Sequence, residues 1–188
     1  MIEWVIAGII LFIIVVLVLI IVYYYNRIRV LKNRIDNAWS QIDVQLKKRA
    51  ELVPNLVEIV QSYMKHEQKA IKLVTESRKA LLSAKTVENK NQAGDLLGGA
   101  LKSLFALAEN YPQLRASENF GKLQEELTTI EDKIAYSRQF YNDSVLTFNN
   151  LVTTIPGKWF AGSMKEKTNP YLETSEEQRK PVKVKFNV

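Results

Sequence analysis

The chain contains 188 residues, of which 47% are hydrophobic and 24% are charged, and its formal net charge is +6. It has no cysteine, which excludes disulfides, cysteine-ligated metal sites and cysteine nucleophiles. Seven glycines and five prolines leave few turn residues, so the composition favours long helices.

An apolar run without charge or proline extends from Trp4 to Tyr25, after a short N-terminal end of residues 1–3. As a helix it spans roughly 33 Å, enough to cross a hydrocarbon core of about 30 Å. Trp4 at one end and Tyr23, Tyr24 and Tyr25 at the other match the aromatic belts of the two membrane interfaces. The sequence therefore predicts a transmembrane helix over residues 4–25.

A cleaved signal peptide is the alternative interpretation of this run. A signal peptide would begin with basic residues and end in a small-residue cleavage site. Here Glu3 is the only charged side chain before the run, and YYYNRIRVLKNR closes it. We therefore expect an uncleaved anchor.

Basic side chains flank one end of the run, and the only basic group at the other end is the amino terminus. The positive-inside rule then predicts a single pass with the N-terminus outside and the C-terminal domain in the cytoplasm, against an anionic inner leaflet. A nucleic-acid-binding surface is the competing interpretation, but no motif supports it, and we expect no nucleic-acid partner. The predicted membrane-interface residues are Trp4, Tyr23, Tyr24, Tyr25, Arg27, Arg29, Lys32 and Arg34.

Helical periodicity follows the anchor. Apolar residues recur at steps of three and four after Tyr25, and no helix breaker occurs before Arg49, so the helix is predicted to continue out of the membrane. Pro54 lacks the N–H that would bond the Ala50 carbonyl, and a kink or a break is expected there. The sequence leaves open whether Pro54 bends one helix or joins two. One apolar face continues beyond it to Arg78.

Two further helices are predicted. The polar stretch SAKTVENKNQAG (residues 83–94) favours a loop. A shorter helix over residues 95–110 is closed by Pro112, because the residue before a proline is pushed out of the helical region. The clearest helix is predicted over residues 118–155, because apolar residues repeat there at seven-residue intervals, starting from Phe120.

Residues 26–155 are therefore predicted to form an antiparallel up-and-down bundle of three to four helices, in an all-α fold. From residue 156 onward no helical period survives, so an extended tail is predicted over residues 156–188. The final VKVKFNV alternates like a strand but has no partner strand. Candidates for docking on the bundle are Trp159, Phe160, Tyr171 and Leu172.

A search for catalytic motifs finds none. His66 is the only histidine, and because no second histidine follows His66-Glu67, a surface or cap role is expected. Four carboxylates could suggest a metal site, but they lie off the seam of the seven-residue repeat, so a solvated face is the better interpretation. These are Glu125, Glu126, Glu131 and Asp132. No cofactor, metal or enzymatic activity is expected.

Three blocks of the sequence carry a family resemblance. They are NAWSQIDVQLKKRAELVPNLVEIVQSYMKHEQ (residues 37–68), LAENYPQLRASENFGKLQEEL (107–127) and IEDKIAYSRQFYNDSVLTFNNLVTTIP (130–156). Together with the leading anchor they resemble the LemA family of bacterial membrane proteins. The resemblance implies a single-span protein of the bacterial inner membrane with a cytoplasmic helical bundle, and it carries over no catalytic residue. Members are associated with the envelope, and some relatives with shaping of internal membranes or with membrane proteases.

Three functions are weighed on this basis. The preferred one is a non-catalytic scaffold at the cytoplasmic face of the membrane, with the bilayer, a second copy or another membrane protein as partner. An adaptor of a membrane protease or quality-control machine is the alternative, and an enzyme with an unrecognised site is the least favoured. Residues within the family-like blocks are expected to hold the bundle together: Trp39, Asp43, Pro54, Asn55, Tyr111, Pro112, Phe120, Tyr141 and Asn142.

Overall fold

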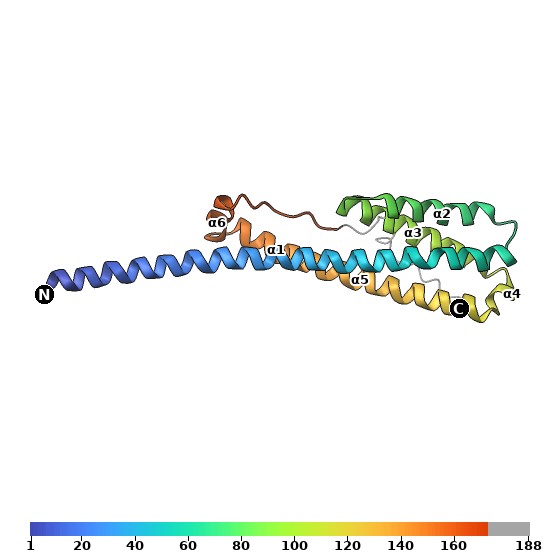
Figure 1. Cartoon of the computed structure of the whole chain (residues 1–188), viewed down its shortest axis with the longest axis horizontal. Helices are drawn as coiled ribbons and strands as arrows, with labels where there is room; N and C mark the ends of the chain where they lie inside the picture. Colours follow the sequence, from blue (N-terminus) through green and yellow to red (C-terminus); the bar gives the residue numbers. More distant parts are fainter. Residues whose placement is uncertain (173–188) are drawn as a thin grey trace, which may run out of the picture. The chain divides into compact units, whose positions relative to one another are not determined.

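The computed structural model describes residues 1–172, and these contain six α-helices and no β-strand (Figure 1). The all-α prediction is confirmed for these residues. The VKVKFNV segment lies outside them. The helices are α1 (Ile2–Tyr63), α2 (Gln68–Ser83), α3 (Val87–Ala108), α4 (Pro112–Arg115), α5 (Glu118–Thr153) and α6 (Gly157–Ser163).

Helix α1 continues without interruption from the apolar run to Tyr63, which confirms that the helix extends beyond the predicted anchor. Pro54 is exposed inside this helix and does not separate two helices. Because proline has no N–H, the carbonyl of Ala50 loses its helical donor. The side chain of Arg78 on α2 replaces it, since Nε donates to the Ala50 oxygen at 2.7 Å. The apolar face predicted as continuous to Arg78 is divided by a turn at residues 64–67.

The chain divides into two compact units, which are described separately. The first unit comprises residues 1–39 and 139–171, and the second comprises residues 40–138 and Leu172. Helices α1 and α5 each contribute residues to both units.

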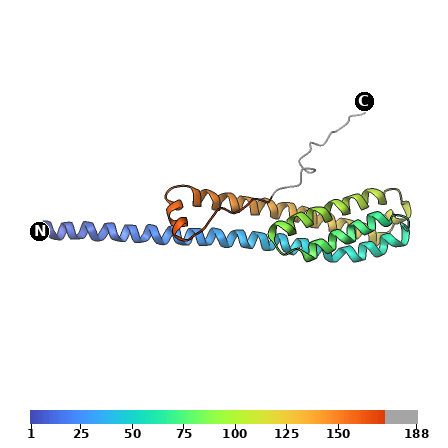
Figure 2. The ribbon, with the colours of Figure 1, turned by 90° about the horizontal axis from the view of Figure 1, so that it is seen from above.

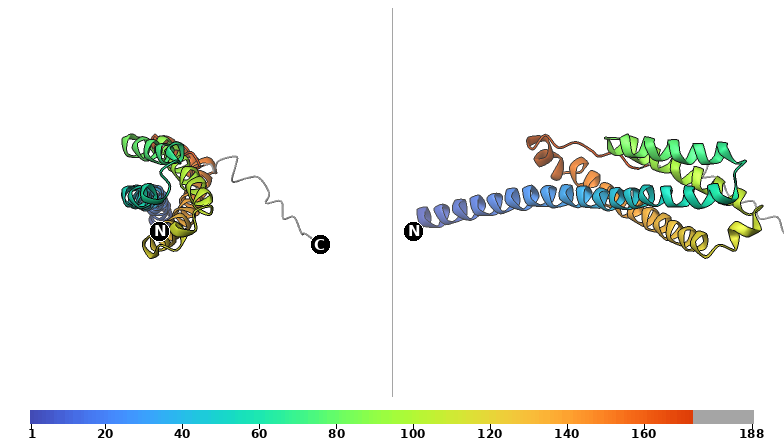
Figure 3. Two further views of the ribbon diagram at one scale, coloured as in Figure 1. Left: turned by 90° about the vertical axis from the view of Figure 1, so that its right-hand side faces the viewer. Right: turned by 45° about the vertical axis from the view of Figure 1, so that its right-hand side comes forward.

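In the second unit, α2 and α3 pack against each other (Figure 3). The ring of Phe105 on α3 meets the ring of Phe120 on α5 edge-on, with centroids 6.0 Å apart. Burying a leucine or isoleucine side chain contributes about 1.5–3 kcal/mol. The best buried of these side chains in the second unit are Ile42, Leu46, Leu56, Leu97, Leu104, Leu114 and Ile134.

Helix α3 is longer than the sequence predicted, and the predicted loop at residues 83–94 is wrong. The helix begins at Val87 because Thr86 adopts extended backbone and its hydroxyl accepts a hydrogen bond from the Asn89 N–H at 3.2 Å. Although most residues of this stretch are polar, they form an amphipathic helix, and buried Ala93 lies on its inner face.

Helix α3 ends at Ala108, ahead of Pro112, as predicted. Pro112 is the first residue of α4. An N–H at this position has no carbonyl partner within the helix, so proline, which lacks the N–H, loses no hydrogen bond there. Leu114 of this single turn is fully buried. The long helix predicted over residues 118–155 is confirmed as α5, which ends two residues earlier.

In the first unit, α1 is long and apolar enough to cross a membrane by length and composition, and its apolar run is uncovered in the structure. Beyond this run α1 packs beside the C-terminal part of α5 (Figure 2). The core between the two helices is formed by Ile28, Leu31, Ile35, Val145 and Phe148.

The extended chain predicted from residue 156 is wrong for residues 157–163, which form α6. Gly157 and Ala161 of α6 are buried one helical turn apart. A Cβ atom at Gly157 would overlap the backbone carbonyl of Leu151, so glycine permits the close approach of α6 to the end of α5. After α6, residues 166–172 have neither helix nor strand.

Candidate membrane-proximal site

Aromatic side chains at the end of the apolar run differ in what they contact. Tyr23 and Tyr25 are exposed, and so is Trp4 near the beginning of α1. The ring of Tyr24 stacks on Phe160 of α6, with centroids 5.0 Å apart and planes 9° apart. Tyr24 is therefore part of a contact within the protein, and this contact aligns α6 with the end of the apolar run.

A tight turn ends α6 and directs the chain back along α1. The Glu166 N–H donates to the Ala161 carbonyl at 3.0 Å, and the Lys165 N–H donates to the Gly162 carbonyl at 3.1 Å. Lys165 adopts a φ of 57°, the left-handed conformation that such a helix end requires. We call residues 164–171, which begin with this turn, the strap.

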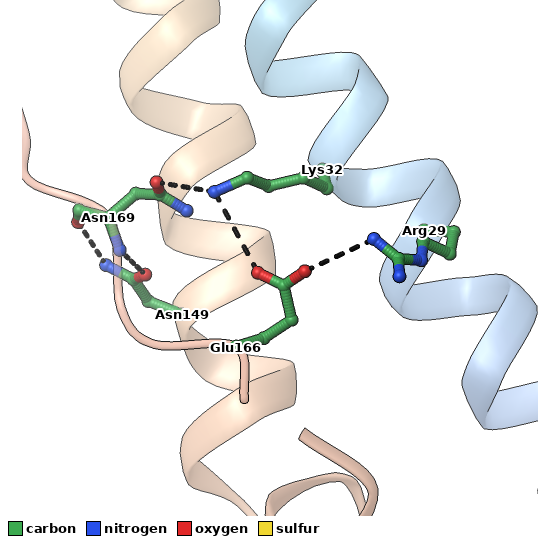
Figure 4. A network of polar contacts seen from close by, with 5 residues as sticks. All are labelled: Arg29, Lys32, Asn149, Glu166 and Asn169. Carbon is green, nitrogen blue, oxygen red and sulfur yellow. Dashed lines mark hydrogen bonds and ion pairs between the residues drawn. The ribbon is translucent and has the colours of Figure 1, made fainter. Parts of the chain in front are cut away.

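The strap brings a carboxylate to the predicted basic cluster (Figure 4). Glu166 Oε1 lies 3.5 Å from Arg29 Nη1, and Glu166 Oε2 lies 3.9 Å from Lys32 Nζ. Lys32 also donates to Asn169 Oδ1 at 3.1 Å. Two of the four predicted lipid-facing cations are thus partly neutralised by a carboxylate 137 residues away from Arg29. The position of Glu166 in a basic tail did not indicate that it would pair with these cations.

The side chain of Asn149 on α5 binds both the backbone N–H and the backbone carbonyl of Asn169 in the strap (Figure 4). Its Nδ2 donates to the Asn169 carbonyl at 3.0 Å, and its Oδ1 accepts from the Asn169 N–H at 2.9 Å. The hydroxyl of Tyr141, also on α5, donates to the Pro170 carbonyl at 3.4 Å. These bonds fix the register of the strap on α5.

The other predicted cations lie on α1 in different surroundings. The guanidinium of Arg34 lies 4.9 Å from the ring centroid of Phe140, a distance at which a cation is attracted to a ring face. Arg27 is exposed and, within residues 1–172, has no carboxylate at ion-pair distance. Arg27 therefore stays available to an anionic surface.

Three of the family-like residues lie in the first unit. Trp39 and Tyr141 meet edge-on with ring centroids 6.4 Å apart, and Asn142 is half-buried on α5. Burial, and then the negative charge of Asp36, raise the pKa of the Tyr141 hydroxyl above its ordinary value.

The remaining six lie in the second unit, and three of them meet different partners. Asp43 accepts a hydrogen bond from Lys90 Nζ at 2.6 Å, and buried Phe120 meets Phe105. The Tyr111 hydroxyl donates to Glu67 at 3.0 Å, and this bond raises the pKa of Tyr111. The other three are exposed, and they are Pro54, Asn55 and Pro112.

A buried charged cluster in the second unit was missed by the sequence reasoning. Arg49 is 2% exposed; it donates to the Gly94 carbonyl at 3.0 Å and pairs with Glu131. Arg138 is buried and pairs with Asp95 at 2.7 Å. Burial, and then the charge of Arg138, lower the pKa of Arg49 to about 10, so Arg49 stays protonated at neutral pH. Glu131 was assigned to a solvated face, and its side chain is 44% exposed, but its carboxylate also pairs with this buried cation, which was not predicted.

The spacing of the sequence contained a signal for both arginines. Arg49 lies seven residues after buried Ile42 and seven before buried Leu56, and Arg138 lies seven before buried Val145. A basic residue on a buried seven-residue stripe predicts a buried charge that needs a partner.

The described residues, 1–172, contain no group of three His, Cys, Asp or Glu side chains placed to hold a metal ion. His66 is exposed in the turn between α1 and α2. Glu125, Glu126 and Asp132 are exposed on α5, as predicted for a solvated face. The membrane-proximal arrangement acts by ring stacking, ion pairing and backbone hydrogen bonding, which hold segments together and present aromatic and cationic groups at one level of α1.

Comparisons with known proteins identify relatives of this chain. The model of the LemA family matches residues 38–186. Magnetosome protein MamQ of Magnetospirillum gryphiswaldense is 23% identical over 65% of this chain and 54% of that protein. Protein LemA of Metamycoplasma hominis is 29% identical over 65% of this chain and 57% of that protein. Magnetosome protein MamQ 2 of Paramagnetospirillum magneticum is 33% identical over 34% of this chain and 24% of that protein. The chain thus spans about half the length of the first two relatives.

Proposed function

The chain belongs to the LemA family, and from this premise we propose that it is a membrane-anchored, non-catalytic helical scaffold. Residues 4–25 of α1 cross the bacterial inner membrane once. Residues 26–155 form an antiparallel up-and-down bundle that recruits partners at the cytoplasmic face. The observation that carries the proposal is the unbroken course of α1, which joins an uncovered apolar run to buried core positions.

The orientation of this scaffold is supported by the charges that follow the apolar run. Arg27, Arg29, Lys32 and Arg34 lie on the C-terminal side of the run. Lys and Arg set orientation, and acidic residues such as Glu166 contribute little, so the ion pairs of the strap leave this argument intact. These charges support the proposal that the bundle lies in the cytoplasm, against the anionic leaflet.

The partners proposed are a second copy of the chain and another membrane protein. Relatives named as magnetosome proteins support a role within an assembly. The polar, exposed surface of α5, which includes Tyr136 with 71% exposure, offers a place for such a contact.

Crosslinking in native membranes tests the scaffold proposal. The chain has no cysteine, so Tyr136→Cys introduces a unique thiol for a bifunctional maleimide. We expect a recurrent covalent dimer or adduct, and a detergent-solubilised mass above that of one chain. Lys133→Cys, an exposed position on the same helix, is the matched control for surface reactivity.

A strict monomer, with no adduct at Tyr136→Cys beyond that at the Lys133→Cys control, contradicts the scaffold. Co-purification of a membrane protease in stoichiometric amount, without self-association, would favour the adaptor role instead.

A further inference from the structure

Two large apolar side chains beside the strap are uncovered. Ile155, just before α6, is 68% exposed, and Trp159 within α6 is 65% exposed. Gly157 and Ala161 form the buried face of α6. At about 100° per residue, Trp159 lies roughly 200° around the helix from Gly157, so it projects from the opposite face.

The position of α6 along α1 is fixed by a ring contact. Phe160, the neighbour of Trp159, stacks on Tyr24. Tyr24 is the penultimate residue of the apolar run, at the level where tyrosine and tryptophan occupy the membrane interface. This contact, which does not involve the ring of Trp159, therefore holds Trp159 at the level of the end of the apolar run.

The charges around α6 suit a lipid surface. Within residues 154–172 the basic side chains are Lys158, Lys165 and Lys167, and the only acidic one is Glu166. Glu166 is already paired with Arg29 and Lys32. An outward tryptophan flanked by lysines, with the one carboxylate neutralised, is typical of an element that lies in the interface.

We propose that α6 is a second membrane contact, which lies in the headgroup region beside the exit of α1 with Trp159 and Ile155 among the lipids. This inference rests on the proposed membrane span of α1. The membrane span anchors the chain, and α6 adds a second contact that holds the first unit against the leaflet.

Lipid quenching of tryptophan fluorescence tests the contact. The chain has three tryptophans, Trp4, Trp39 and Trp159. Phenylalanine at two of them leaves one reporter in the full chain, reconstituted into phosphatidylcholine–phosphatidylglycerol vesicles with brominated lipids. We expect Trp159 to lose about half of its fluorescence when bromine is near the headgroup end of the acyl chain, and less when bromine is near the chain terminus.

The other two reporters serve as internal controls. Trp39 follows Tyr24 by a helical distance of roughly 22 Å, so its fluorescence should be unchanged by any brominated lipid. Trp4 lies at the beginning of the apolar run and reports whether α1 itself is in the bilayer.

The outcomes separate this inference from the proposed function. An unquenched Trp4 contradicts the membrane span and the function built on it. A quenched Trp4 with an unquenched Trp159 leaves the span intact and overturns the lipid contact of α6, whether water, a second copy or another protein covers Trp159.

A pair of variants tests what positions α6. Phe160→Ala removes the ring stacked on Tyr24 and should reduce the quenching of Trp159. Phe105→Ala removes a comparable ring contact with Phe120 in the second unit and should leave the quenching unchanged. Equal quenching in both variants contradicts positioning through the stack.

Discussion

At the scale of single residues, Pro54 and Arg78 form a compensating pair. A proline inside a helix costs about 3 kcal/mol, in part because the carbonyl four residues earlier loses its donor. The 2.7 Å bond from Arg78 Nε to Ala50 gives that carbonyl another donor. Pro54 is exposed, and α1 continues through it to Tyr63.

A double-mutant cycle measures this compensation. Arg78→Ala alone should lower the free energy of unfolding by about 1–2 kcal/mol, because the Ala50 carbonyl is left without a donor. In a Pro54→Ala background the restored N–H bonds that carbonyl, and the loss should shrink by about 1 kcal/mol. Denaturant unfolding in detergent, followed by circular dichroism, gives the four free energies.

Lys79→Ala is the control for this cycle, since Lys79 is the exposed neighbour of Arg78. Its effect should be the same with and without Pro54. Strictly additive effects of Arg78→Ala and Pro54→Ala would show that the two positions are independent.

The raised pKa of the Tyr141 hydroxyl predicts that the free energy of unfolding depends on pH. Its folded-state pKa is raised, by burial first and by Asp36 second, above the unfolded value of about 10. Its contribution is therefore complete below about pH 10 and is lost as the pH rises through the folded pKa. The free energy of unfolding should fall more steeply above about pH 10 in the wild type than in Tyr141→Phe. Parallel curves for the two proteins would contradict this.

At the scale of elements, the sequence predicted the helices that have a long apolar repeat. Helices α1 and α5 repeat over many turns, and their course beyond Tyr25 and from Glu118 was predicted correctly. Helix α6 has only seven residues and two buried positions, too few for a period to emerge. The start of α3 depends on the single cap of Thr86 within a polar stretch.

The membrane-proximal site was predictable only in part, for a related reason. The aromatic and basic residues of α1 lie close together in the sequence, at residues 23–34, so their pattern is visible there. The partners Glu166, Asn169 and Phe160 come from distant sequence and depend on the turn at Lys165. Contacts between residues so far apart in the sequence produce no periodic pattern, so the sequence alone does not indicate them.

The strap should detach when its hydrogen bonds to α5 are removed. Asn149→Ala deletes the donor and the acceptor that hold Asn169, which opens the strap locally. Trypsin cleavage after Lys165 or Lys167 should accelerate by about tenfold, which corresponds to about 1.4 kcal/mol of lost closing free energy.

The matched control for the strap is Asn150→Ala, an exposed neighbour on the same helix. Its cleavage rate should equal that of the wild type. Equal rates for both variants would show that Asn149 does not hold the strap.

At the scale of the whole molecule, the proposed orientation predicts which cysteines a membrane-impermeant maleimide can reach. Ile2→Cys, at a residue 76% exposed, should be labelled from outside intact spheroplasts. Glu118→Cys, at an exposed position at the start of α5, should be labelled only after the membrane is permeabilised. The reverse pattern would invert the orientation, and labelling of both in intact cells would contradict a cytoplasmic bundle.

The contacts made by Tyr24, Arg29 and Lys32 also restrict how α1 can spin about its long axis. A lone helix in a bilayer turns freely because lipid is the same on every side. Here the stack on Phe160 and the pairs with Glu166 bind α1 to α6 and the strap. Helix α1 and α6 therefore turn as one body, so a neighbour docked on the first unit would always meet the same stripe of the apolar run.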